Sequence, residues 1–599
     1  MSTAVKNKVI KGGEFLIKET EALDIFIPDD FTEEQLMIKQ SCQEFLDQEV
    51  YPRLDEIDSM KHPELMPSLM DKAGELGLLG TSVPERFGGF GMNFNTSMLI
   101  AEVLGAGHSF AVAMSAHTGI GTLPILYYGT EDQKTKYLPK LATGEWKAAY
   151  CLTEPDSGSD ANAAKTKAAL TEDGKHYLIN GQKMWITNGG FADVLIVFAR
   201  IEDDKYLTSF IVEREFGGIT MNEEERKMGI KGSSTRQIFF NDCKVPVENM
   251  LSDRQNGFKI AVNILNIGRI KLGVAAVGAC KAILERAINY SNERHQFGAP
   301  ISSYGAIKHK LAECAARTYA SEAAHYRAGQ NIDDAYNALV AEDMDPAQAR
   351  LKSVEQFAIE CAILKVHGSE CLDFVVDEGV QIYGGMGYST EAPMDRAYRD
   401  ARINRIFEGT NEINRMLVLD MMLKRGMKGE LDIMGPAQAV AKELMAIPDF
   451  GTDGVDVKWY QEKKVLSNLK KAALMIAGAA VQKFMMKLSH EQEIVMHLAD
   501  MLIQIYVAES SLLRTEKLVE VHGEDKCSDQ IDLFRIYLYY ALDQTQIAGK
   551  QAIYAFAEGD ELRMMLLGLK RYTKIEPFNL KEARRRVADA MIKENNYVY

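Results

Sequence analysis

Apolar residues recur at helical spacing along most of the chain and change to strand-like spacing in one region only. From residue 32 to 149 the pattern predicts successive helices, the first opening at Thr32 with a Thr-Glu-Glu-Gln capping box. From 150 to 256, short β-rich runs separated by Gly and Asn predict an antiparallel barrel or sandwich. Helical spacing returns over 257–426, where four long segments predict a four-helix bundle.

The other parts of the chain complete an α+β fold that is mainly α. Residues 1–31 form a predicted N-terminal arm, and residues 427–459 form a linker that contains Gly and Pro. Helical spacing after the linker predicts an additional C-terminal helical domain over 460–599, with helices near 460–488, 491–520, 529–557 and 580–593.

Two further segments of the chain carry specific predictions, and the second allows two interpretations. The acidic stretch 331–346 is expected to be an exposed helical elaboration of the bundle. Residues 436–447 of the linker could form a short amphipathic helix, which would either pack on protein or make a peripheral contact with a membrane surface.

Composition and charge narrow the class of protein. The 599 residues are 46% hydrophobic and carry a formal net charge of -16 with no compensating basic block, which argues against nucleic acid as a partner. No apolar run approaches the length of about 18 residues that a membrane span needs, so we expect no transmembrane helix. The N-terminus lacks the apolar core of a signal peptide and the acid-poor character of a transit peptide, which predicts a cytoplasmic location.

The spacing of the cysteines and the absence of common enzyme motifs argue against a metal site and against several classes of enzyme. The eight cysteines form no CxxC pair and no cluster of metal-ligand spacing, so we expect free thiols in a reducing compartment and no metal site. The sequence contains no GxGxxG, GxxxxGK[ST], GxSxG or HExxH motif. A Rossmann fold, a P-loop, a hydrolase elbow and a zincin are therefore disfavoured.

One carboxylate stands in a setting that suits acid-base chemistry. Glu408 lies between Phe407 and Gly409, just ahead of a predicted helix that Thr410 or Asn411 can cap. Apolar neighbours raise the pKa of a carboxyl group towards the range of a general base. A capping or exposed role for this Glu is the alternative on local evidence.

Three loops carry glycines, hydroxyls and aromatic rings that could hold a cofactor. They are Cys151–Ala161, Trp185–Thr187 and Gln381–Tyr388. Backbone amides and small residues of this kind can hold an extended polar cofactor. Taken singly, each has a simpler interpretation, respectively a capped turn, a core tryptophan and a helix C-cap.

Taken together, these motifs strongly resemble the acyl-CoA dehydrogenase family, and the resemblance runs from about residue 32 to 425. Cys151–Ala163 resembles the family's first signature and Gln381–Asp400 its second. Further matches fall in the family's order, at Lys183–Gly189, Met228–Ser233, Arg294–Gly298 and the Glu408 segment. The chain length, the C-terminal extension and the phrase Ile264–Arg269 are most similar to the very-long-chain branch.

The resemblance implies bound FAD and a set of residues that contact it. One group would contact the flavin and its chain: Tyr150, Cys151, Leu152, Thr153, Gly158, Ser159, Trp185, Ile186 and Thr187. A second group would contact FAD bound mainly by a partner subunit of a homodimer: Arg294, Gln296, Phe297, Gln381, Gly384 and Gly385. Thr410 and Glu412 would lie near the cofactor.

The same resemblance implies the reaction. Glu408 would take the α-proton of an acyl-CoA thioester while the β-carbon passes hydride to flavin N5, which yields a trans-2-enoyl-CoA in fatty-acid β-oxidation. Some branches place the base just before Arg269, where this chain has Gly268, which cannot abstract a proton. The implied substrate contacts are Ser159, Asn266, Arg269, Phe407, Gly409, Gly119 and Gly121.

Substrate length and electron acceptor are further expectations. Small residues at Gly119 and Gly121 leave volume for a long acyl tail, so we expect a preference for long chains. The expected acceptor is an electron-transfer flavoprotein. The alternatives are an acyl-CoA oxidase that uses oxygen and a non-catalytic scaffold or assembly protein on the same fold.

Overall fold

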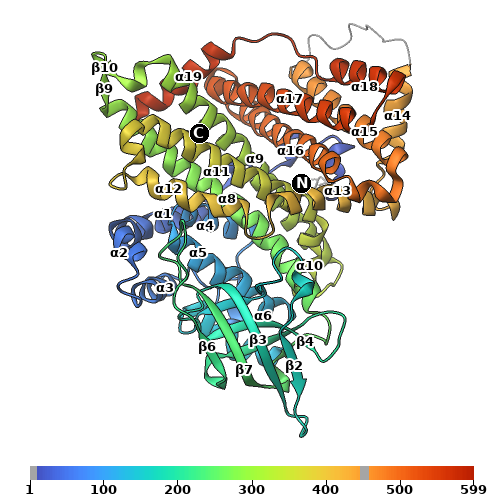
Figure 1. Cartoon of the computed structure of the whole chain (residues 1–599). Helices are drawn as coiled ribbons and strands as arrows, with labels where there is room; N and C mark the ends of the chain where they lie inside the picture. The colour runs from blue at the N-terminus through green and yellow to red at the C-terminus, as the bar shows by residue number, and fades with distance from the viewer. Residues whose placement is uncertain (1–9, 446–457) are drawn as a thin grey trace, which may run out of the picture.

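The computed structural model describes residues 10–445 and 458–599. Figure 1 shows the C-terminal helices as the top layer, the long bundle helices across the middle, and the N-terminal helices with the β-sheet below. Most of the predicted N-terminal arm is described and packs on the molecule, with Phe15, Ile25 and Ile27 buried. The first nine residues of that arm and 446–457 of the predicted linker lie outside the described residues.

The N-terminal domain is helical, as predicted. A π-helical turn at Ala116–Gly121 interrupts the helical stretch from Ser109 to Tyr128. Thr130 caps helix α7 with the same kind of capping box that the sequence shows at Thr32. The helices are α1 Glu33–Phe45, α2 Leu54–Ser59, α3 Leu65–Glu75, α4 Phe94–Gly105, α5 Ser109–Ser115, α6 Leu123–Tyr128 and α7 Glu131–Thr143.

The middle domain is an eight-stranded sheet with the order β6-β7-β3-β2-β4-β5-β8, and β1 pairs with β4. The prediction of an antiparallel domain holds for most pairs but is wrong for β1–β4 and β2–β4, which are parallel. The strands are β1 Ala148–Cys151, β2 Lys167–Leu170, β3 His176–Thr187, β4 Val194–Ile201, β5 Thr208–Glu213, β6 Ile219–Met221, β7 Thr235–Pro246 and β8 Met250–Leu251.

The bundle consists of four long helices, as predicted, with two shorter ones between them. One of the four predicted helical segments is interrupted at Phe357, which separates α10 from α11. A two-stranded hairpin, β9 His295–Gln296 and β10 Ala299–Pro300, follows the first helix. The helices are α8 Gly257–Glu293, α9 Gly305–Ala341, α10 Pro346–Gln356, α11 Ala358–Tyr383, α12 Pro393–Ala401 and α13 Asn411–Met427.

The acidic stretch 331–346 is the exposed elaboration that we expected only in its second half. Its first part continues α9, and Ile332, Asp333 and Ala335 are buried there. The Asp333 carboxylate accepts hydrogen bonds from the first two backbone N–H groups of α4, at 3.1 Å each. A carboxylate that satisfies free helix N–H groups is stabilising, which explains why an acidic residue is buried here.

The C-terminal domain contains the predicted helices and one, α18, that was not predicted. Helix α16 packs against both α9 and α13, so this domain rests directly on the bundle. Helix α14 packs on α15 with Val440 buried, while Ile447 of the proposed membrane-contact segment lies outside the described residues. The helices are α14 Met434–Met445, α15 Tyr460–Phe484, α16 Gln492–His522, α17 Ser528–Phe556, α18 Gly559–Tyr572 and α19 Leu580–Glu594.

Two helical stretches of the described chain are long and apolar enough to cross a membrane by length and composition alone. They are Ser109–Tyr128 and Gly257–Glu293. In each, 67% of the tested window is buried inside the fold, as in a core helix of a soluble protein. The second stretch, α8, is the central helix of the bundle in Figure 1.

Helices α4 and α8 cross at very short range, and this crossing shapes the interior. A Cβ atom at Gly278 would lie 1.7 Å from the carbonyl oxygen of Glu102, and one at Gly105 would lie 2.3 Å from that of Ala275. Glycine is therefore required at both positions. The close crossing brings the N-terminal domain onto α8 beside the cavity described below.

Candidate functional site

The Glu408 turn joins α12 and its short 3-10 extension to α13. Glu408 has a φ of 59° and Gly409 a φ of 82°, both left-handed. Such a φ is strained for a non-glycine residue and persists only where the surroundings hold it. Thr410 then caps α13 by accepting a hydrogen bond from the Ile413 N–H at 3.3 Å, as the sequence allowed.

The Glu408 carboxyl group points at α8. Its Oε2 atom is buried and has no hydrogen-bond partner. A Cβ atom added at Gly268 would lie only 2.7 Å from that oxygen. Burial raises the pKa of Glu408 from 4.5 to about 7, and the positive charges of Arg269 and Lys365 oppose this rise. The side chain is thus a carboxylate poised to exchange a proton near neutral pH.

Three side chains hold the backbone of this turn. The Arg269 Nε atom donates to the carbonyl oxygen of Glu408 at 3.3 Å. Lys365 Nζ and Asn414 Nδ2 donate to the carbonyl oxygen of Gly409 at 2.7 and 2.8 Å. These bonds fix the two peptide planes that the positive φ values require.

Asn266 and Arg269, two of the predicted substrate contacts, are hydrogen-bonded to each other beside the Glu408 turn. Arg269 is 6% exposed and donates from Nη1 to Asn266 Oδ1 at 2.8 Å. Gly409 also faces protein, because an added Cβ would meet Asn414 Nδ2 at 3.2 Å. Glycine is therefore needed at position 409 for conformational reasons, because only a residue without Cβ fits this φ and this space.

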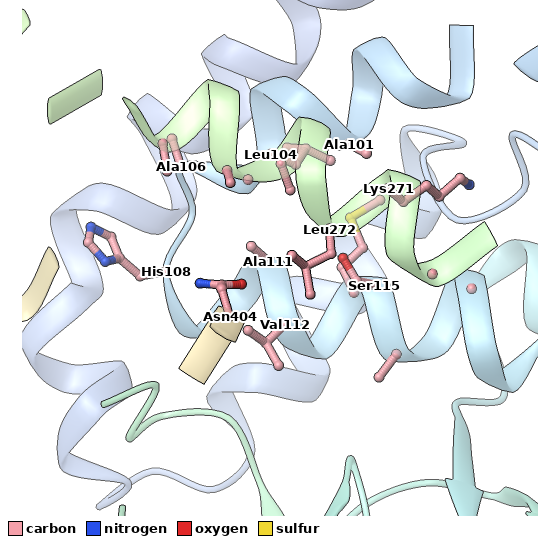
Figure 2. Close-up of a pocket in the computed structure, with 18 of the residues that line it drawn as sticks. Ala101, Leu104, Ala106, His108, Ala111, Val112, Ser115, Lys271, Leu272 and Asn404 are labelled. Atoms are coloured by element: carbon pink, nitrogen blue, oxygen red, sulfur yellow. The ribbon is translucent and has the colours of Figure 1, made fainter. Parts of the chain in front are cut away.

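A mainly apolar cavity begins at Glu408 and Phe407 and runs between α4, α5 and α8. Figure 2 shows Leu104, Ala111, Val112 and Leu272 around it, with His108 and Asn404 towards one end and Lys271 at the other. The α8 residues that line the cavity extend from Ile264 to Arg286: Ile264, Ile267, Gly268, Lys271, Leu272, Ala275, Ala276, Ala279, Ala282, Ile283 and Arg286.

The two glycines predicted to line an acyl tail have different positions. Gly119 lines the cavity, and a Cβ added there would meet no atom within 4 Å. Gly121 packs against β1, because its added Cβ would lie 2.6 Å from the Cβ of Ala148. Gly119 therefore contributes open volume, whereas Gly121 permits close packing of the sheet against the π-helical turn.

The β domain brings one predicted cofactor-binding residue to the same cavity. Thr187, at the end of β3, lines the cavity together with Glu408. The register of β3 shifts between Lys183 and Ile186, and Trp185 within that bulge has a φ of 60° and is 52% exposed. A bulge re-aims a side chain away from the sheet, which leaves this indole ring free to contact a ligand.

The loop that follows β1 is held by a buried ion pair. Lys183 is 0% exposed and donates from Nζ to Glu154 Oε1 at 2.6 Å and to the Leu152 carbonyl oxygen at 3.2 Å. Tyr150 and Cys151 lie on β1, with Thr153 after it, and the Tyr150 hydroxyl is buried without a partner. At Gly158, next to exposed Ser159, an added Cβ meets no atom within 4 Å.

The third group of predicted residues lies at the other end of α8. The stacked rings of Tyr290 and Tyr383, with centroids 4.0 Å apart, join the end of α8 to the end of α11. About 26 residues of helix separate this end from Gly268, which is about 39 Å at the α-helical rise. The group is solvent-exposed, with Phe297 97% exposed, and comprises Arg294, Gln296, Phe297, Gln381, Gly384 and Gly385.

Four further residues lie at or near the Glu408 turn. Glu412 is exposed in the first turn of α13, beside Thr410. Lys365, Asn411 and Asn414 hold the turn but were not singled out as site residues. A lysine within the apolar pattern of α11 was the one available signal for Lys365, because a buried lysine needs acceptors.

The geometry suits FAD and a proton transfer at a dry carboxylate. The exposed Trp185 ring, the unpartnered Tyr150 hydroxyl and the open backbone at Gly158 lie on or beside the two strands β1 and β3. An aromatic face, unpaired hydrogen-bonding groups and accessible backbone are what a flavin with its polyhydroxyl chain requires. Thr187 connects this surface to the cavity of Glu408.

Family models match four consecutive parts of the chain. They are described as the acyl-CoA dehydrogenase N-terminal domain (32–145), middle domain (149–243) and C-terminal domain (255–423), and a second acyl-CoA dehydrogenase C-terminal domain (468–571).

Individual relatives agree with these models. A probable acyl-CoA dehydrogenase of Bacillus subtilis is 44% identical over 590 residues, 98% of each chain. The very long-chain specific acyl-CoA dehydrogenase of rat mitochondria is 43% identical over 354 residues, which cover 57% of this chain and 51% of that relative. A crystal structure of a Bacillus anthracis acyl-CoA dehydrogenase complexed with FAD matches with a TM-score of 0.95 and 43% identity, covering 98% of this chain and 100% of that one.

Proposed function

Since this chain belongs to the acyl-CoA dehydrogenase family and is a FAD-dependent oxidoreductase, we propose that it converts long-chain acyl-CoA to trans-2-enoyl-CoA with Glu408 as the base. The observation that carries the proposal is the position of the Glu408 carboxyl group, which is buried at the start of the apolar cavity with its Oε2 atom unpartnered.

Glu408 is suited to accept the α-proton of a thioester. Burial among apolar groups keeps the pKa of this carboxyl at about 7, so its conjugate acid is far weaker than an exposed glutamic acid. The bonds to the carbonyl oxygens of Glu408 and Gly409 prevent the turn from relaxing. A base that is held in place spends no free energy on reorganisation in the transition state.

FAD would be held by the residues of β1, of the loop after it and of β3. Trp185, Thr187 and the backbone from Tyr150 to Thr153 provide the ring contact and the hydrogen-bonding groups, with Gly158 and Ser159 beside them. Cys151 and Ile186 are buried, at 0% and 2% exposure, so their contribution would come from the backbone. When bound, FAD supplies the two-electron oxidant of the reaction.

The length of the cavity supports a preference for long acyl chains. Gly268 and Arg286 both line it and are 18 helical residues apart, or about 27 Å along α8. Each C–C bond is about 1.5 Å long, so a saturated chain of sixteen carbons is at most about 23 Å long, which is less than this length. The open space at Gly119 adds width to the same cavity.

The residues at the far end of α8 support a dimer in which each site uses two chains. Arg294, Phe297 and Gln381 are about 39 Å along α8 from the Glu408 turn, so one chain cannot bring both groups to the same flavin. Their exposure leaves them free to contact FAD bound by a second copy. The proposed electron acceptor is an electron-transfer flavoprotein.

The experiment is a turnover profile of the purified enzyme over acyl-CoA lengths, with electron-transfer flavoprotein and oxygen compared as acceptors. We expect palmitoyl-CoA to be oxidised faster than butyryl-CoA, and the flavoprotein to be the better acceptor. Faster turnover of butyryl-CoA would contradict the chain-length proposal. Efficient turnover with oxygen would identify an oxidase, and a colourless protein that stays inactive with added FAD would identify a scaffold.

A further inference from the structure

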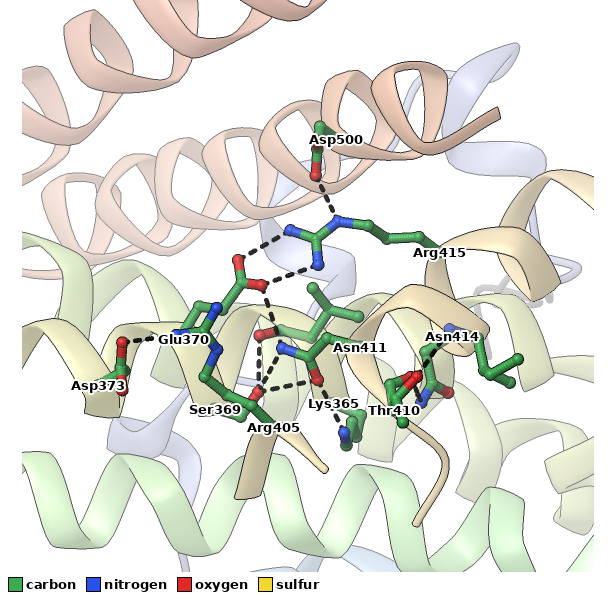
Figure 3. A network of polar contacts seen from close by, with 12 residues as sticks. Lys365, Ser369, Glu370, Asp373, Arg405, Thr410, Asn411, Asn414, Arg415 and Asp500 are labelled. Carbon is green, nitrogen blue, oxygen red and sulfur yellow. Dashed lines mark hydrogen bonds and ion pairs between the residues drawn. The ribbon is translucent and has the colours of Figure 1, made fainter. Parts of the chain in front are cut away.

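A continuous chain of hydrogen bonds joins the C-terminal domain to the Glu408 turn. Figure 3 shows its course from Asp500 on α16, through Arg415 and Glu370, to Asn411 and Lys365. Lys365 then donates to the carbonyl oxygen of Gly409, the residue that follows the base.

The inner part of the chain is buried. Lys365 is 0% exposed and Asn411 is 1% exposed. Lys365 Nζ divides its hydrogen bonds between the Gly409 carbonyl oxygen and Asn411 Oδ1, both at 2.7 Å. Asn411 Nδ2 in turn donates to Ser369 Oγ at 3.0 Å and to Glu370 Oε1 at 3.1 Å. A buried ammonium group must keep its hydrogen bonds, so these two acceptors hold Lys365 Nζ in one position.

The outer part is a paired guanidinium. Arg415 donates from Nη1 and Nη2 to the two oxygens of Glu370, at 2.8 and 2.9 Å. Its Nε atom donates to Asp500 Oδ1 at 2.7 Å. The two-pronged contact fixes the plane of the guanidinium, and therefore the Glu370 oxygen that Asn411 uses.

Lys365 also acts on Glu408 through its charge. The charged groups that face Lys365 are Glu408, Glu370, Glu412 and Arg269. Burial lowers the pKa of Lys365 to about 7, and Glu408 opposes this effect. Conversely, the ammonium group opposes the rise in the pKa of Glu408.

We propose that Lys365 is a positioning residue for Glu408, and that the C-terminal domain holds Lys365 in place through Asp500, Arg415, Glu370 and Asn411. The inference rests on the proposed role of Glu408 as the base. It assigns the C-terminal domain a function in the reaction, in addition to covering the bundle.

The principal test is Lys365→Met in the full-length enzyme loaded with FAD. We expect kcat with palmitoyl-CoA to fall at least about tenfold, while KM changes less than about threefold, because the base loses its position and the substrate cavity is unaltered. The acidic limb of the kcat/KM profile should move to higher pH by about one unit, because the positive charge beside Glu408 is lost. Infrared titration of the Glu408 carboxyl, assigned by difference with Glu408→Gln, should show the same shift.

Lys424→Met is the matched control. Lys424 lies on α13, its side chain is 62% exposed, and its ion pair within the described part of the chain is with Asp420 at 2.7 Å. This variant should have wild-type kcat and pH dependence. A Lys365→Met enzyme that binds FAD and keeps the wild-type kcat and pH profile would overturn the proposal.

The C-terminal part of the proposal is tested by Asp500→Asn, whose side chain is 35% exposed. We expect kcat to fall about three- to tenfold in the wild-type background and to be unchanged in the Lys365→Met background, because both act through one chain. Equal effects in both backgrounds would contradict the connection. If Lys365→Met does not fold, Lys365→Gln replaces it, and an unshifted Glu408 titration in that variant overturns the proposal.

These results are distinguishable from a failure of the proposed function. If Glu408 is not the base, Glu408→Gln retains turnover whatever happens at Lys365. If Glu408 is the base and only the positioning role is wrong, Glu408→Gln is inactive while Lys365→Met is normal.

Discussion

Glu408 rests against the bare backbone of Gly268, where an added Cβ would lie 2.7 Å from Oε2 and 3.1 Å from the carboxyl carbon. The two residues are 140 positions apart and meet where α8 passes the turn before α13. The absence of a side chain at one position thus creates the space for the carboxyl group at the other. By the resemblance, some branches of the family place the base at the position of Gly268, which cannot abstract a proton, and in this structure that position lies next to the Glu408 carboxyl group.

The first prediction concerns this contact. Gly268→Ala should lower kcat with palmitoyl-CoA by about ten- to a hundredfold, because the new methyl group displaces the Glu408 carboxyl from its position. FAD content should remain unchanged, since Gly268 lies outside the strands proposed to hold the cofactor. Steady-state kinetics and the flavin absorbance of the purified variant measure both.

Gly305→Ala provides the control for this substitution. Gly305 begins α9, and its added Cβ would come no closer than 3.6 Å, to an Arg585 side-chain nitrogen. Its kcat should match the wild type. If Gly268→Ala also retained wild-type kcat, the close contact would have no catalytic importance.

The second prediction is an opposite response of activity and stability to pH. Turnover should rise as pH passes through about 7, because Glu408 must lose its proton to act. The pKa of Glu408 in the folded state lies above its ordinary value of 4.5. The proton on Glu408 therefore stabilises the fold fully below pH 4.5, and this stabilisation is lost as the pH rises through 7. Glu408→Gln removes that loss, and its melting temperature should fall about 1 to 3 °C less than the wild type's between pH 5 and pH 8. Identical pH dependence of melting in both proteins would refute the raised pKa.

The third prediction concerns chain length. Gly119→Leu should reduce kcat/KM for palmitoyl-CoA by at least about tenfold, because the side chain would fill open cavity volume. Hexanoyl-CoA should be affected less than about threefold, which makes the short substrate the control within the same variant. A uniform loss for all lengths would show that Gly119 does not border the acyl tail.

The fourth prediction tests the loop after β1. Lys183→Met leaves the Glu154 carboxylate buried without its cation, which is destabilising and should loosen the segment from Leu152 to Glu154. We expect the dissociation constant of FAD to rise about tenfold, measured by flavin fluorescence on rebinding to apoenzyme. Lys167→Met is the control, because Lys167 lies on β2 with its side chain 64% exposed. Equal FAD affinity in both variants would show that the ion pair does not order the cofactor loop.

The sequence was sufficient for the class of fold because helical and strand spacing are local patterns. Local patterns singled out the Glu408 turn but left its role open, and its assignment as the base came from the family resemblance and stays a prediction. Helical spacing identified the long helices, and the Thr32 box marked the start of α1. Local patterns do not specify which strands pair, so the parallel β1–β4 and β2–β4 pairs were missed. The break at Phe357 was missed because apolar spacing continues through it.

The polar groups that hold the site depend on contacts between distant segments. Lys365, on α11, holds the turn before α13, and Asp333, on α9, caps α4. Neither pairing follows from spacing along the chain, because each requires the packing of the helices to be known. The position of Gly121 against Ala148 is of the same kind. In such cases the sequence shows a charged or small residue within an apolar pattern. The distant contact that explains the residue is visible only in the folded structure.

The most direct measurement for the whole account is the anaerobic rate at which palmitoyl-CoA bleaches the flavin of Glu408→Gln. With FAD bound as in the wild type, the rate should fall by about a hundredfold or more, the usual contribution of a general base. The amide keeps the size of the carboxyl group, so the cavity and substrate binding should be unchanged. Bleaching at a rate near that of the wild type would contradict the assignment of Glu408 as the base.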